Sequence, residues 1–195
     1  LSIFPALKEK FPESNIYVIT KSESLQLFEN NLFVKKAFLF SDSAFFDIKF
    51  DILYNLDVEP EATELAVKIN AGKKHGFYSQ DGFPVAFNIG AEYYLNTMFD
   101  DYLKKKNTKT YQEMMFEILE LEYNKQHCGI YLNEGDRNYA EKFISKNKIK
   151  NNKIMGIHLG ASSRWPSKVW HREELKKFII LAKHKKYNII LFAGP

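Results

Sequence analysis

Apolar residues alternate between helical and strand spacing through residue 78. The first stretch has helical spacing, with Pro5 in its first turn and Ile3, Phe4, Leu7 and Phe11 on one face. The next runs predict a strand at 15–20, a helix at 22–30 capped by Ser22, strands at 35–40 and 50–57, a helix at 60–71 and a strand at 73–78. This alternation predicts right-handed βαβ units and a mainly parallel sheet covered by helices.

The pattern becomes helical from residue 88 to about residue 147. Helices are predicted at 91–106, 110–123 and 135–148, and the aromatic run 83–99 has the spacing of a helical core segment. The charged run 148–153 is typical of a linker. A strand at 154–160, a helix at 171–187 and a strand at 188–195 then begin a second βαβ layer. We therefore predict two α/β domains, 1–147 without the first strand of its sheet and 154–195 as the start of another.

Composition fits a globular chain, because 45% of the 195 residues are hydrophobic and 27% are charged. No run of about 18 uncharged apolar residues occurs, and no signal-peptide pattern is present. The single cysteine, Cys128, fits a reducing compartment, so we expect a cytoplasmic protein. Residues 101–195 carry 19 basic and 10 acidic side chains against 9 and 14 in residues 1–100, so the C-terminal half suits an anionic ligand.

The stretch GASSRWPSKVW, residues 160–170, carries the chemistry of that half. Gly160 follows a predicted parallel strand, where the backbone of an open α/β sheet meets its ligands. Backbone N–H groups, the Ser162 and Ser163 hydroxyls, Arg164 and Lys168 all favour an anion, and a diphosphate is the natural guest. A surface loop held to the core by its two tryptophans explains the spacing equally well.

The loop and its flanks resemble glycosyltransferase family 9, the bacterial heptosyltransferases of lipopolysaccharide synthesis. Gly160-Ala161-Ser162, Lys168-Val169-Trp170, the helix from His171 and the final LFAGP match the family's order and approximate spacing. PALKEKFPESNIYVIT near the start, and FDILYNLD through KKHGF, resemble the family's N-terminal helix and strands. Residues 79–150 show the weakest similarity.

The resemblance implies a GT-B architecture, in which two Rossmann-like domains hold an acceptor and an ADP-sugar donor. The donor-binding residues would be Gly160, Ala161, Ser162, Ser163, Arg164 and Lys168. Lys168 would neutralise the leaving diphosphate, whereas Trp170 is expected to pack the loop. The implied reaction is inverting and needs neither cofactor nor metal. The acceptor would be a lipid-linked glycan, with peripheral contact at the inner membrane face and no nucleic-acid partner.

The family's catalytic base is the aspartate of a Gly-Asp loop that precedes the Pro-Ala-Leu helix. The sequence starts at Leu1, after that point, so the resemblance implies that these 195 residues alone do not transfer sugar. Asp57 and Glu59 follow a predicted central strand and are acceptor-side candidates, with Asp57 also a candidate base. The alternative is that both acids cap the helix beginning near Pro60.

Other residue patterns leave two further function classes open. His158 is expected to be a hydrogen-bonded core residue, and the remaining histidines lack the clustering of a metal site. A nucleotide-sugar epimerase of GT-B shape would keep the Lys168 loop but would need carboxylates on both sides of the cleft. A non-catalytic nucleotide or nucleic-acid binding module would use the basic half and would lose affinity steeply with salt.

Overall fold

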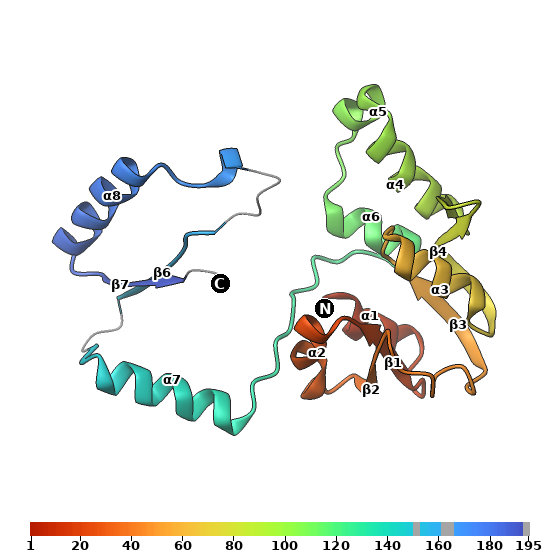
Figure 1. The fold of residues 1–195 in the computed structure, drawn as a ribbon, viewed down its shortest axis with the longest axis horizontal. Coiled ribbons are helices and arrows are strands. Elements are labelled where there is room, and N and C mark those ends of the chain that lie inside the picture. Colours follow the sequence, from red (N-terminus) through yellow and green to blue (C-terminus); the bar gives the residue numbers. More distant parts are fainter. Residues whose placement is uncertain (150–152, 161–165, 193–195) are drawn as a thin grey trace. The chain divides into compact units, whose positions relative to one another are not determined.

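The computed structural model describes residues 1–149, 153–160 and 166–192 (Figure 1). The chain falls into two compact units, Leu1–Leu132 and Asn133–Pro195. The predicted boundary at the linker 148–153 stays a prediction, and residues 150–152 of that linker lie outside the described residues. Within the described residues, no helix is long and apolar enough to cross a lipid bilayer.

Unit 1 begins with two helices and two strands, all close to their predicted positions. They are α1 (Ile3–Lys10), β1 (Ile16–Thr20), α2 (Ser22–Glu29) and β2 (Val34–Leu39). β1 and β2 pair in parallel, with Val18 opposite Ala37. The prediction that Ser22 caps α2 is wrong, because Lys21 is the N-cap residue and the Ser22 hydroxyl donates to Glu23 Oε2 at 3.1 Å.

The second half of the sheet region carries β3 (Phe50–Asn55), α3 (Pro60–Lys68), β4 (Ala71–Gln80) and β5 (Phe83–Ala86). Pro60 is at the start of α3, as predicted, since proline has no N–H to leave unpaired there. β3 and β4 pair in parallel, whereas β4 and β5 form an antiparallel hairpin. The sequence predicted no strand here, because the run 83–99 has helical spacing. Its first four residues nevertheless form β5.

Helices follow β5, as the sequence predicted, but with different bounds. They are α4 (Ile89–Phe99), α5 (Asp101–Lys106) and α6 (Tyr111–Ile118). The single helix predicted at 91–106 is two helices, because the Asp100 carboxylate accepts hydrogen bonds from the backbone N–H groups of Tyr102 and Leu103 and so caps α5. The Thr110 hydroxyl and the Glu113 carboxylate form a capping box that starts α6.

The core of unit 1 lies on both faces of its strands. Phe77, Ala91, Leu95, Met114, Met115 and Ile118 form one cluster between β4, α4 and α6. A second cluster joins α1 to the chain after α6 through Phe4, Leu7 and Leu119, and a third contains Phe38, Phe45 and Ile69. Residues of β1 and β3 contribute to both the second and the third cluster, although the ladders of the described residues form separate sheets, β1–β2 and β3–β4–β5.

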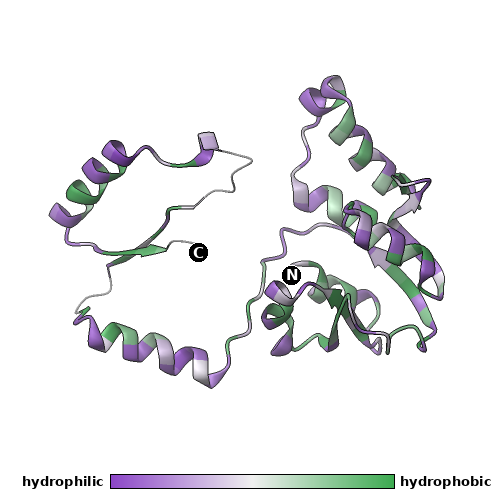
Figure 2. Ribbon diagram, viewed as in Figure 1, coloured by the Kyte–Doolittle hydropathy of each residue, from purple (hydrophilic) through white to green (hydrophobic). Residues whose placement is uncertain are grey.

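Unit 2 contains one strand–helix–strand repeat preceded by a helix. Its elements are α7 (Glu134–Lys146), β6 (Ile154–His158), a 3₁₀ turn at Pro166–Lys168, α8 (Arg172–His184) and β7 (Asn188–Phe192). β6 and β7 pair in parallel, with Ile157 opposite Leu191. Figure 2 shows apolar residues on the strands and along one side of α8. Three of the four strand pairings are therefore parallel, which confirms the predicted α/β class with mainly parallel sheets.

Candidate functional site

The predicted phosphate loop begins at the carboxyl end of β6. The Leu159 N–H donates to the Phe192 carbonyl at 2.8 Å, so the β6–β7 ladder continues to the residue before Gly160. A Cβ at position 160 would lie 3.1 Å from Cε1 of the exposed His158 side chain, a close approach that a rotation of the imidazole would relieve. The predicted donor residues Ala161, Ser162, Ser163 and Arg164 lie outside the described residues. Their roles stay predictions.

The far side of the loop leads into α8. Lys168 ends the 3₁₀ turn and is exposed, and the Val169 N–H closes the turn on the Pro166 carbonyl at 3.1 Å. Trp170 packs its ring on Phe178 of α8, with ring centroids 4.8 Å apart. This contact confirms the prediction that Trp170 packs the loop. Lys168 therefore lies two residues before the Trp170 contact, which joins this part of the chain to α8.

Acidic side chains at the start of α8 affect which group can attract an anion. Glu173 and Glu174 lie in the first turn of the helix, where their charges offset the positive end of its dipole. The positive charge that the α8 dipole presents to the loop is thereby reduced, so full charges on side chains matter more here. Lys168 and, at the first position of α8, Arg172 are described cations of this segment. His158 is exposed, so the prediction that it is a core residue is wrong.

The other predicted site lies at the carboxyl end of β3, where Asn55 fixes the turn that carries Asp57. The Asn55 amide donates to the Phe77 carbonyl at 2.8 Å and to the Asp57 carbonyl at 3.0 Å, and its oxygen accepts from the Asp57 N–H at 3.1 Å. Asp57 Oδ1 accepts from the Glu59 N–H at 3.0 Å. Glu59 is the N-cap residue of α3 but forms no side-chain cap bond there, so the capping alternative is wrong for Glu59.

Two tyrosines from different helices lie near Asp57. Tyr94 of α4 packs on Phe77, and its ring is 6.0 Å from that of Tyr111 of α6, in an edge-to-face arrangement. Burial raises the pKa of Tyr94, and the Asp57 charge raises it further. The pKa of Tyr111 is raised by burial, then by Tyr94 and Asp57. The charge of one exposed carboxylate thus acts on two phenol groups, and carboxylate and phenol groups together suit a polyhydroxy ligand.

A basic side chain completes this edge of unit 1. Lys21 follows β1 and forms an ion pair with Glu61 of α3 at 3.1 Å. The hydrogen bond to Glu61 raises the pKa of Lys21, and the charges of Glu61, Asp57 and Glu59 raise it further. Lys21 was not among the predicted site residues, although its position directly after a predicted strand was a usable signal. Tyr94 and Tyr111 were not predicted either, because helical spacing does not show which strand end a helix approaches.

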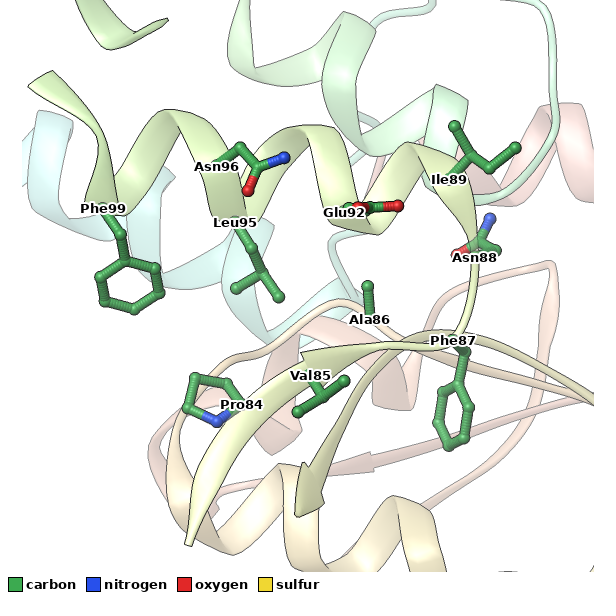
Figure 3. Close-up of a pocket in the computed structure, with 10 residues that line it drawn as sticks. All are labelled: Pro84, Val85, Ala86, Phe87, Asn88, Ile89, Glu92, Leu95, Asn96 and Phe99. Atoms are coloured by element: carbon green, nitrogen blue, oxygen red, sulfur yellow. The ribbon is translucent and has the colours of Figure 1, made fainter. Parts of the chain in front are cut away.

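A groove lies between β5 and α4, on a part of unit 1 that the sequence did not single out (Figure 3). Its volume is about 610 Å³. Its apolar lining includes Pro84, Val85, Ile89 and Phe99, and its polar lining is Asn88, Glu92 and Asn96. Among the described residues there is no group of three or more histidine, cysteine, aspartate or glutamate side chains that could hold a metal ion.

A comparison of the sequence with family models identifies the family. Residues 46–195 match the model of glycosyltransferase family 9 (heptosyltransferase), which is more than half of the chain. The chain belongs to glycosyltransferase family 9. No curated protein matches the sequence.

A solved structure shares the fold of this family 9 chain. The crystal structure of the glycosyl transferase family 9 from Veillonella parvula DSM 2008 matches with a TM-score of 0.74 at 18% sequence identity. The match covers 100% of this chain and 58% of the other, so the family 9 chain described here spans a little over half the length of that relative. The fold is the GT-B type that the resemblance implied, with Rossmann-like α/β units.

Proposed function

We propose that this protein transfers a sugar, with heptose as the first candidate, from an ADP-sugar to a lipopolysaccharide-core or related glycan acceptor. The observation that carries the proposal is the β6–α8–β7 unit, in which Gly160 follows the carboxyl end of β6 and Lys168 precedes α8. Family membership over residues 46–195 supports the reaction type. In this proposal residues 1–147 form the acceptor domain and residues 154–195 begin the donor domain.

The donor side would bind the diphosphate through the 160–168 loop. Backbone N–H groups near Gly160 and the hydroxyls of Ser162 and Ser163 would donate to phosphate oxygens, as strand–helix loops do in nucleotide-binding folds. Lys168 and Arg164 would supply positive charge as the leaving nucleotide gains negative charge. Two cations in this loop supply the neutralisation that a divalent metal provides elsewhere, and we therefore propose metal-independent transfer.

The acceptor side would lie at the carboxyl ends of β1 and β3. Asp57 and Glu59 would accept hydrogen bonds from sugar hydroxyls, and the exposed ring of Tyr111 offers an apolar wall for a pyranose face. Asn55 holds the backbone of the Asp57 turn, and the Glu59 N–H donates to Asp57 Oδ1, so the carboxylate is oriented before any ligand arrives. Asp57 would then bind the acceptor, or act as the base if no other carboxylate does so.

The proposed chemistry is a single displacement at the anomeric carbon. An acceptor hydroxyl forms the new C–O bond while the bond from that carbon to the donor phosphate oxygen breaks, so the configuration inverts. A carboxylate takes the proton of the attacking hydroxyl, and the leaving ADP keeps the electron pair of the broken bond. A lipid-linked acceptor would place the protein in the cytoplasm, at the inner membrane face.

The direct test uses a protein that contains these 195 residues together with the family's Gly-Asp loop, and incubates it with ADP-heptose and a lipopolysaccharide-core acceptor. Formation of an acceptor–heptose product with inverted anomeric configuration, at an unchanged rate in excess chelator, is the expected result. Isomerised donor without acceptor glycosylation would contradict the proposal and indicate an epimerase. Loss of transfer in chelator, with recovery on adding a divalent cation, would contradict metal independence.

A further inference from the structure

Unit 1 exposes a group of aromatic and aliphatic side chains beside a run of lysines. We call this surface the α4–α5 patch; it comprises Phe83, Met98, Phe99, Tyr102, Leu103 and Lys104–Lys106. Phe83 and Phe99 are each 72% exposed and Tyr102 is 62% exposed. α4 runs from the β4–β5 hairpin to α5 at the end of the unit (Figure 1), and Phe99 and Pro84 lie at the same end of the groove (Figure 3).

The cap of α5 accounts for this exposure. α4 packs its Ala91 and Leu95 against Phe77 in the core. Asp100 then ends α4 and caps α5 by accepting from the N–H groups of Tyr102 and Leu103. The chain after Phe99 is thereby fixed as a short helix outside the core clusters. Its apolar side chains are exposed and follow one another along the chain, and contiguous exposed apolar patches are typical of surfaces that meet a partner or a membrane.

Acidic side chains lie at the start of α5 and basic side chains at its end. The acidic residues Asp100 and Asp101 are at its start, and Asp100 is engaged with backbone N–H groups, whereas all three residues of its last turn are lysines. Within the described part of the chain none of Lys104–Lys106 has a carboxylate partner, and the Lys106 ammonium lies 4.2 Å from the Tyr102 ring centroid. Lys109, by contrast, pairs with Glu117 at 2.6 Å.

We propose that the α4–α5 patch docks unit 1 on a lipid bilayer that carries anionic phosphate headgroups. Exposed phenylalanine and leucine side chains gain by entering the boundary of the acyl chains, and a tyrosine ring with an ammonium above it suits the headgroup level. Unpaired lysines at the end of the same helix attract the phosphates. The inference rests on the proposed function in one respect, since a lipid-linked acceptor would already bring the protein to the inner membrane face. What it adds is the surface that makes the contact, which contains none of the proposed donor or acceptor residues.

Vesicle binding tests the proposal on the intact chain. Binding is measured by flotation with phosphatidylcholine vesicles that contain or lack phosphatidylglycerol. We expect binding to the anionic vesicles, and a loss of affinity of roughly a hundredfold when Lys104, Lys105 and Lys106 are all replaced by glutamine. The matched control replaces Lys176, Lys183 and Lys185, which are exposed and outside the patch, and should bind like the wild type.

A second pair of variants tests the apolar part of the α4–α5 patch. Phe99→Ser with Tyr102→Ser should lower affinity for anionic vesicles about tenfold or more, whereas Ile130→Ser with Tyr139→Ser, two equally exposed positions, should have little effect. Far-UV circular dichroism confirms that each variant is folded.

Three results would overturn the proposal. One is absence of binding to anionic vesicles. Another is equal loss of binding in a patch variant and its matched control, since net charge or general apolarity would then explain it. The third is a concentration-dependent dimer that Phe99→Ser with Tyr102→Ser abolishes, because a second copy of the chain would then cover the patch.

Discussion

Replacing Asn55 by alanine removes the side chain that ties the end of β3 to β4 and to the turn carrying Asp57. The Asn55 amide makes three hydrogen bonds, to the Phe77 carbonyl, the Asp57 carbonyl and the Asp57 N–H. The bond to Phe77 is partly buried, whereas the two bonds to Asp57 are exposed to solvent. The three contacts therefore contribute unequally to stability.

The magnitude follows from this difference in burial. The Phe77 carbonyl would lose a partner in a partly buried position, which costs roughly 1 to 2 kcal/mol, and each exposed bond contributes a few tenths because water replaces it. We expect Asn55→Ala to lower the free energy of unfolding by about 2 kcal/mol. Asn55→Asp should be at least as destabilising, because it keeps the size of the side chain but turns a donor toward Phe77 into a charged acceptor.

Urea unfolding followed by far-UV circular dichroism measures both variants. Asn124→Ala is the matched control, since Asn124 is exposed and makes its described hydrogen bond through the backbone N–H. An Asn55→Ala variant within about 0.5 kcal/mol of the wild type would refute the reasoning, since surface substitutions without a special role fall in that range. An Asn55→Asp variant as stable as the wild type would show that the amide donors contribute nothing.

Three further predictions concern stability. Burial lowers the pKa of His75 below its usual 6.5, so in acid the unfolded chain binds more protons than the folded chain. The free energy of unfolding should therefore fall as the pH drops from about 6.5 through the folded-state pKa. Urea titrations of His75→Gln should show a weaker dependence of stability on pH. Gly76→Ala should lower the free energy of unfolding by roughly 4 kcal/mol or more, because Gly76 has φ +91° and the new Cβ would overlap the backbone of β3. Gly82→Ala, with φ +82° and open space around the new Cβ, should lower it by only about 1–2 kcal/mol in the same assay. Trp170→Ala should lower stability by about 1 kcal/mol in thermal melts through loss of the Phe178 contact, and an unchanged melting temperature would contradict it.

The sequence predicted most elements of the fold because their apolar periods are clear. It failed where local hydrogen bonds compete with periodicity. Asp100 interrupts a continuous helical pattern by capping α5, and a carboxylate can do this wherever it reaches two free N–H groups. β5 was not predicted because it has only four residues, between the Asp81-Gly82 turn and α4, and contains Pro84. Such a strand is too short to show the two-residue alternation of apolar and polar side chains. A one-residue shift of the N-cap, from Ser22 to Lys21, lies within the usual uncertainty of helix ends.

The candidate site was predicted in part. Gly160, Lys168, Asp57 and Glu59 follow strands in the structure, as the strand–loop pattern indicated, and the binding roles of all four stay predictions. Tyr94 and Tyr111 could not be predicted, because their place near Asp57 depends on how α4 and α6 pack on Phe77. His158 was assigned to the core because it lies inside a predicted buried strand, but alternate residues of β6, His158 among them, are exposed.

The most direct test of the central claim is calorimetric titration of an ADP-sugar into the protein and its Lys168→Ala variant. The account predicts that the variant binds the donor roughly tenfold to a hundredfold more weakly, since a charge-assisted contact to phosphate contributes about 1.5–3 kcal/mol. Its thermal melt should match the wild type, because Lys168 is exposed, and Lys176→Ala on α8 should bind as the wild type does. Equal donor affinity of wild type and Lys168→Ala, with both melts unchanged, would contradict the claim that the 160–168 loop holds the donor diphosphate.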